Sequence, residues 1–120
     1  MTDHSSPVAD DRPLTRQETE LLRWLLEHGK PAAGGHIGEV SRARVVSRCG
    51  CGCASIDFIK APGSALEILS DHQWQDEQGH RFGAFAFAKE GKLAGLEVWS
   101  IDGLATPKSL PDTSLLTPVS

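Results

Sequence analysis

Three cysteines within one short stretch are the residues of this chain best suited to chemistry. Cys49, Cys51 and Cys53 alternate with glycine in the sequence RCGCGCASI. Thiolates bind zinc and copper(I), so one hypothesis is a metal site built on these sulfurs, with His72 or His80 completing the shell. The spacing counts against this hypothesis, because structural zinc sites usually contain C-x2-4-C pairs.

The same cysteines allow two other interpretations. A reactive thiol is one, but the C-x-C spacing differs from the usual C-x-x-C, and no obvious helix start follows to lower a cysteine pKa. Packing is the other, and it is the interpretation we favour, because cysteine is small and readily buried. An odd number of cysteines does not make a complete disulfide framework.

Two histidines form a second candidate for chemistry. His72 and His80 flank a polar loop, Asp76–Gly79, that ends in glycine. If this loop closes a hairpin, the two imidazoles lie near each other across neighbouring strands. With Asp71 and Asp76 they would make a metal site or an acid–base pair. The alternative, which we favour, is that both histidines are surface residues near the hairpin end.

One helix is expected near the start of the chain. Thr15 and Glu18 form a capping-box pattern, and Gly29 is suited to the position after the last turn. Four leucines then fall on one stripe at helical spacing, which predicts a face packed on a sheet; they are Leu21, Leu22, Leu25 and Leu26. Trp24 lies beside this stripe.

The rest of the chain predicts about five antiparallel strands. Alternating or β-rich segments indicate these strands; they cover residues 43–49, 55–59, 66–74, 81–89 and 92–101. Glu90-Gly91 predicts a two-residue hairpin loop between the last two strands. In the register that this loop implies, Phe85 faces Leu96 and Gly83 faces Val98.

These elements together predict an α+β fold, in which an N-terminal amphipathic helix packs on the antiparallel sheet. We expect residues 1–13 to form a disordered tail, residues 14–111 a single domain, and residues 112–120 a C-terminal tail.

The composition limits the classes of function. The chain has 120 residues, 39% of them hydrophobic and 23% charged, which is typical of a soluble single-domain protein. Its net charge of −4 disfavours binding to nucleic acid or to anionic membranes. No signal-peptide segment follows the first residue, and no apolar run approaches about 18 residues, so we expect a cytoplasmic protein.

The usual catalytic and cofactor motifs are missing from the sequence. It contains no phosphate-binding loop, no G-x-G-x-x-G, no H-E-x-x-H and no G-x-S-x-G. The sequence therefore predicts no catalytic residue and no cofactor other than the zinc considered above.

Three stretches resemble a set of small uncharacterised bacterial proteins. These are Arg48–Ile56 (RCGCGCASI), the upstream TRQExxLL, and the downstream GLEVWSIDG. The resemblance covers about residues 14–111 and implies a bacterial, cytoplasmic origin. It implies no activity, cofactor or catalytic residue.

The function that we expect is therefore non-catalytic. Trp99, Phe82 and Trp24 are the candidate residues of a surface that binds a protein partner. A small acidic immunity or antitoxin-like protein is one concrete form of this hypothesis. The alternative is a zinc-binding module that uses the three cysteines with His72 or His80.

Overall fold

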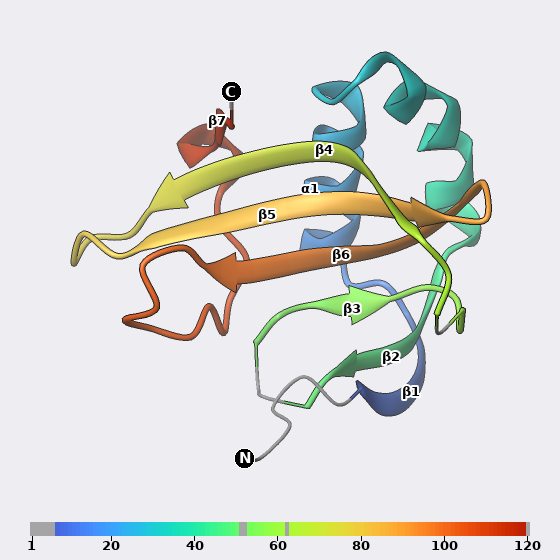
Figure 1. The fold of residues 1–120 in the computed structure, drawn as a ribbon, viewed down its shortest axis with the longest axis horizontal. Coiled ribbons are helices and arrows are strands. Elements are labelled where there is room, and N and C mark those ends of the chain that lie inside the picture. Colours follow the sequence, from blue (N-terminus) through green and yellow to red (C-terminus); the bar gives the residue numbers. More distant parts are fainter. Residues whose placement is uncertain (1–6, 51–52, 62, 120) are drawn as a thin grey trace.

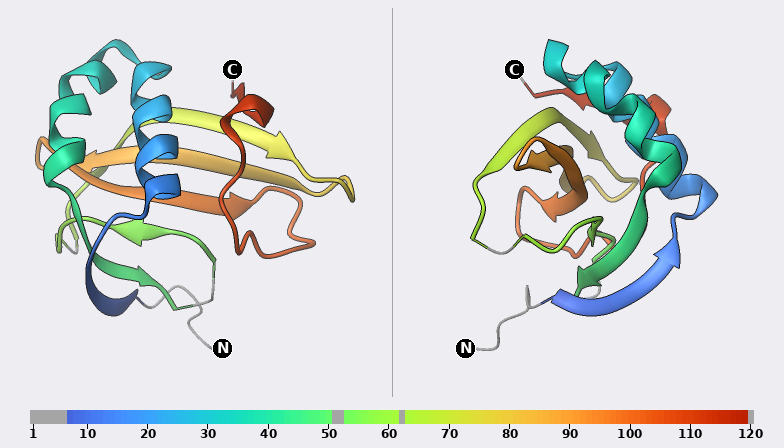
Figure 2. Two further views of the ribbon diagram at one scale, coloured as in Figure 1. Left: turned by 180° about the vertical axis from the view of Figure 1, so that it is seen from behind. Right: turned by 90° about the vertical axis from the view of Figure 1, so that its right-hand side faces the viewer.

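A computed structural model describes residues 7–50, 53–61 and 63–119, and its main feature is one antiparallel sheet of seven strands. The strand order is β1-β2-β3-β6-β5-β4-β7. Helix α1 and the 3-10 helix η1 lie on the same side of this sheet (Figures 1 and 2). The elements in chain order are β1 (Pro7–Pro13), α1 (Arg16–Glu27), η1 (Pro31–Arg42), β2 (Arg44–Cys49), β3 (Ile56–Asp57), β4 (Leu66–Gln75), β5 (Arg81–Lys89), β6 (Lys92–Ser100), η2 (Thr113–Leu115) and β7 (Thr117–Pro118).

The α+β class and the antiparallel sheet are confirmed, but the strand number and the position of the helix were predicted wrongly. The two extra strands are β1 and β7, which form the sheet edges. Strand β1 precedes the helix and pairs with β2, so residues 7–13 are not a free tail. Edge strands need no apolar alternation, because much of their surface faces water, and this explains why the sequence pattern missed them. Residues 1–6 lie outside the described residues.

Helix α1 begins as its sequence predicts. The Thr15 side chain accepts a hydrogen bond from the Glu18 amide, and the Glu18 carboxylate accepts one from the Thr15 amide at 2.8 Å. All four leucines of the predicted stripe are at most 2% exposed. Glu18 is buried, and Arg12 of β1 binds both of its oxygens at 2.9 and 3.0 Å. This bidentate pair attaches the edge strand to the helix.

The leucine face of α1 packs against a strip of alanines on β5. Ala84, Ala86 and Ala88 are fully buried and share one face of the strand. Methyl side chains leave room for a helix to approach the sheet closely, and the leucines then fill the space between the two layers. Phe82 lies on the same face and is 5% exposed. The face of the sheet that α1 covers is therefore decided by these small residues.

The end of α1 comes very close to β4. The Lys30 amide donates a hydrogen bond to the Leu69 carbonyl at 2.9 Å, which fixes the chain directly after Gly29 against the sheet. A Cβ atom at Gly29 would lie 2.7 Å from the Ser70 Cβ and would collide with the Leu69 carbonyl oxygen. Glycine is therefore required here for close approach, rather than for a left-handed turn.

Helix η1 follows shortly after the end of α1. The segment has Pro31 in its first turn, a position that suits proline because its missing N–H would have no partner there. At its far end, Glu39 accepts a hydrogen bond from the Leu93 amide of β6 at 3.1 Å. This bond attaches η1 to the same sheet face as α1.

The hairpin between β5 and β6 has the predicted turn but a different register. Glu90 and Gly91 have φ values of 54° and 76°, as expected for a type I′ turn, and Lys89 pairs with Lys92. Beyond the turn, the pairing shifts between Phe87 and Ala88. The predicted pairing of Phe85 with Leu96 was wrong, because this bulge brings Phe85 opposite Glu97.

Substitution of Gly29 by alanine tests the contact between helix and sheet. We expect Gly29→Ala to lower the free energy of unfolding by about 1–3 kcal/mol, the usual cost of forcing an extra group into a packed site. Gly38→Ala is the matched control, because a Cβ at Gly38 meets no atom within 4 Å. Urea unfolding followed by tryptophan fluorescence measures both. Equal stabilities of the two variants would contradict the close approach.

Candidate functional site

The sheet has one face that neither α1 nor η1 covers, and we call it the outer face (Figure 1). The cross-strand pairs identify its residues. Those from the three central strands are Asp57 of β3, Gly83, Phe85, Phe87 and Lys89 of β5, and Gly95, Glu97 and Trp99 of β6. This face therefore combines aromatic rings, two glycines and three charged groups.

Two aromatic rings of the outer face lie over glycines of the neighbouring strand. The indole of Trp99 covers Gly83, where an added Cβ would lie 2.8 Å from the indole Cε2. The ring of Phe87 covers Gly95, where an added Cβ would lie 2.5 Å from Cζ. An aromatic ring over a strand glycine supplies the packing that the glycine lacks. Phe87 is buried, whereas Trp99 is held in place and is still 44% exposed.

Glu97 is a partly buried carboxyl two residues before Trp99. The Ser55 hydroxyl lies 2.8 Å from Glu97 Oε2 and 3.0 Å from the Val98 carbonyl, and it accepts a hydrogen bond from the Val98 amide. One hydroxyl hydrogen cannot satisfy both oxygens. Burial raises the pKa of Glu97, the Ser55 hydrogen bond lowers it, and the nearby Asp57 raises it further, for a net upward shift.

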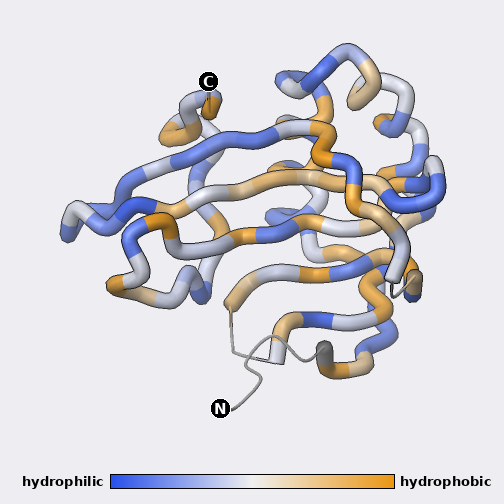
Figure 3. Tube along the Cα trace, viewed as in Figure 1, coloured by the Kyte–Doolittle hydropathy of each residue, from blue (hydrophilic) through white to orange (hydrophobic). Residues whose placement is uncertain are grey.

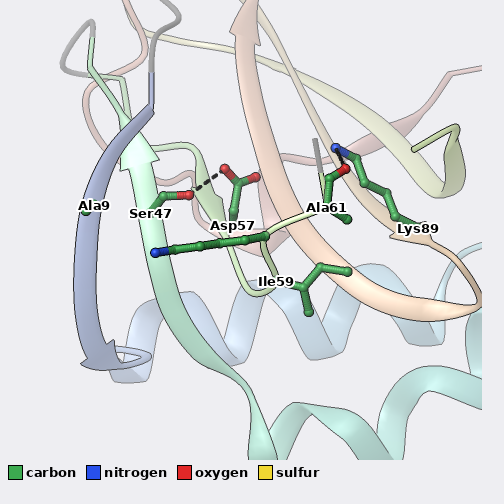
Figure 4. Close-up of a pocket in the computed structure, with 7 residues that line it drawn as sticks. Ala9, Ser47, Asp57, Ile59, Ala61 and Lys89 are labelled. Carbon is green, nitrogen blue, oxygen red and sulfur yellow. Dashed lines mark hydrogen bonds between the residues drawn. The ribbon is translucent and has the colours of Figure 1, made fainter. Parts of the chain in front are cut away.

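A pocket of about 350 Å³ opens where β1, β2 and β3 meet the start of the β3–β4 connection and the end of β5 (Figure 4). The Ser47 hydroxyl donates a hydrogen bond to Asp57 at 2.9 Å inside it. Lys89 lies across from Asp57 and donates a long hydrogen bond of 3.5 Å to the Ala61 carbonyl. The Lys89 ammonium also lies 6.0 Å from the centre of the Phe87 ring.

The structure describes only part of the predicted metal site. Cys49 is disulfide-bonded. Cys53 is a free cysteine, and it lines a second pocket together with Arg48 and Lys108. Cys51 lies outside the described residues. Among those that are described, no group of three His, Cys, Asp or Glu side chains could hold a metal ion. The zinc hypothesis stays a prediction, because one of its ligands is not described.

The two predicted histidine ligands occupy different surroundings. His80 precedes β5 and lies 4.0 Å from Asp102, whereas His72 pairs with Ala84 on β4. Ala84 lies four residues after His80, a distance of roughly 13 Å along an extended strand. The expected proximity of His72 and His80 across the hairpin is therefore not found. His72 lies within β4, three residues before the end of this strand.

His72 belongs to a buried polar cluster under α1. Its Nδ1 lies 3.2 Å from the Ser70 hydroxyl, and its ring meets Trp24 edge-on at 4.9 Å. Figure 3 shows the corresponding hydrophilic stretch in β4. Burial lowers the pKa of His72, His28 lowers it further, and Asp71 opposes this. Ser70 is 1% and His72 3% exposed, so this serine–histidine pair is closed to a substrate.

The three aromatic residues predicted for a partner surface differ in their access to water. Trp99 is exposed on the outer face, while Phe82 is buried on the opposite face against Trp74. Trp24 stacks on His28 at 4.0 Å and packs against the core. The predicted patch of Trp99 with Phe82 is therefore corrected, because the bulge in β6 turns their side chains to opposite faces.

The pocket residues were not predicted as a group. Ser47 and Asp57 belong to strands that the sequence does reveal, but Lys89 is remote from both in sequence. The available signal was the charged residues inside otherwise apolar strands, namely Asp57 in IDFI and Glu97 in GLEVW. Such residues on a buried-looking strand indicate a polar site.

Comparison of this chain with protein-family models, with curated proteins and with solved structures finds no match in any of the three. In the described part of the chain, no helix has both the length and the apolar character needed to cross a membrane.

The state of the cysteines gives a direct test of the metal hypothesis. We expect Cys53 to react with iodoacetamide in the native protein and Cys49 to react only after reduction, because a disulfide sulfur is neither a nucleophile nor a thiolate ligand. Peptide mapping by mass spectrometry distinguishes the two. Zinc in the purified protein together with protection of both residues would contradict this arrangement.

The partly buried carboxyl of Glu97 predicts a pH dependence of stability. Because folding raises its pKa, the folded state holds this proton more tightly, so its contribution lowers the free energy of unfolding as pH rises above 4.5. We expect Glu97→Gln to be more stable than the natural chain at pH 7, with the difference shrinking toward pH 4.5. Urea unfolding across this range measures the difference. The exposed control Glu77→Gln should stay within about 0.5 kcal/mol of the natural chain, and a pH-independent effect at Glu97 would contradict the assignment.

Proposed function

We propose that this chain is a non-catalytic interaction protein that binds a protein partner through the outer face of its sheet. The observation that carries the proposal is Trp99, which is 44% exposed although its indole packs on Gly83. A side chain that is fixed before binding loses little conformational entropy when a partner covers it. Tryptophan is also among the residues that contribute most often to binding hot spots.

Neighbouring apolar side chains extend this surface. Phe85 is half-buried beside Phe87, with 5.8 Å between the ring centres. Leu66, which is 45% exposed, pairs with Lys89 at the far end of the same face. Three strands thus supply apolar groups to the outer face, while α1 and η1 cover the opposite face of the sheet. An exposed apolar face of this kind is typical of a protein–protein contact.

The finer features of the proposal rest on composition and on the resemblance described above. Small size and net charge −4 support an immunity or antitoxin-like binder from a bacterium. We also propose a cytoplasmic location, on the basis of the resemblance to small bacterial proteins. The disulfide at Cys49 counts against this location, because structural disulfides persist mainly in oxidising compartments.

Trp99→Ala tests the surface. With tagged protein as bait in a bacterial lysate, we expect proteins retained by the natural chain to be lost with Trp99→Ala, with at least a tenfold fall in retained amount. Leu104→Ala is the control, because Leu104 is 72% exposed in the loop after β6. Urea unfolding verifies that both variants fold. Retention of the same proteins by a folded Trp99→Ala variant would contradict the proposed surface.

A further inference from the structure

We propose that the pocket between Asp57 and Lys89 binds a small zwitterion, which is a molecule with one primary ammonium and one carboxylate joined by a short carbon chain. A small-molecule site here would be separate from the proposed protein interaction, because it uses the charged residues at one end of the outer face and not Trp99. Its basis is a pair of opposite charges that line one pocket without contacting each other (Figure 4).

The two charges are available to a ligand. Neither Asp57 nor Lys89 forms an ion pair with any described residue. Partly buried charges that face one another across a pocket gain most when a ligand of matching polarity lies between them. An ammonium near Asp57 and a carboxylate near Lys89 would satisfy both groups at once.

Hydrogen-bond capacity remains on each side. Ser47, which is buried, donates to Oδ2 of Asp57 and so fixes the carboxylate, leaving Oδ1 for a ligand ammonium. Lys89 has three donors, of which the structure shows one in a long bond to the Ala61 carbonyl. The remaining donors can reach a ligand carboxylate. Bonds between charged partners of this kind are stronger than neutral ones.

The other lining residues select for size and charge. Ala9, Ile59 and Ala61 supply apolar walls, and a volume of about 350 Å³ is near the lower end of the range for small-molecule pockets. Lys60, which is exposed, adds a second ammonium to the lining. The described lining residues thus hold two ammonium groups and one carboxylate. Because the ammonium groups are in excess, we expect the pocket to bind ligands that carry a carboxylate and to reject an amine that has none.

A series of ω-amino acids tests the proposal on the full chain. The probes are glycine, β-alanine, γ-aminobutyrate and ε-aminocaproate, with butylamine and butyrate as single-charge controls. Heteronuclear NMR titration at millimolar concentrations reads the amide shifts of Asp57 and Lys89. We expect at least one ω-amino acid to bind ten times more tightly than both single-charge controls and to shift these amides.

Two variants assign the charges. Asp57→Asn keeps an oxygen acceptor for Ser47, and Lys89→Met keeps an apolar chain near Phe87, so both should fold; each should weaken binding at least tenfold. Lys92→Met is the control for Lys89→Met, because Lys92 pairs directly with Lys89 but lies outside this pocket, and it should bind normally. Absence of binding by every ω-amino acid, equal binding of butyrate, or undiminished binding by folded Asp57→Asn would each overturn the proposal.

Discussion

The packing of the α1 leucines on the alanine strip of β5 determines the rest of the structure. Leu21, Leu22, Leu25 and Leu26 need a close, apolar surface, and Ala84, Ala86 and Ala88 provide it. Once the helix occupies that face, the other face of the same strands must meet water or a partner. The exposed position of Trp99 and the pocket beside Asp57 both follow from this choice of face.

The two irregularities in the central strands control which residues share a face. The pairing of β5 with β6 shifts at Phe87/Ala88, and the pairing of β4 with β5 shifts at Ile68/Ser70. A slip of one residue moves every following side chain to the opposite face. The first shift places Trp99 and Glu97 on the outer face, and the second places Ser70 and His72 under α1. Both the open surface and the buried polar cluster therefore depend on these shifts.

Local signals in the sequence were sufficient for the elements that depend on local contacts. The capping box at Thr15, the leucine stripe and the turn at Glu90-Gly91 each involve residues that are close in sequence, and the structure has all three. The edge strand β1, the strand shifts and the pocket around Asp57 could not be predicted in this way. Each arises from pairing between distant segments, as in the pairing of Arg12 with Val45 or the approach of Lys89 to Ala61.

The central claim is that Trp99 lies on the outer face, over Gly83, and not on the face that packs against α1. Nuclear Overhauser spectroscopy tests it most directly. The structure predicts cross-peaks between the Trp99 indole protons and the Gly83 α protons, with the latter shifted upfield by the ring current. Cross-peaks from the Trp99 indole to the methyl groups of Leu21 or Leu22 would place this side chain under the helix and would contradict the account.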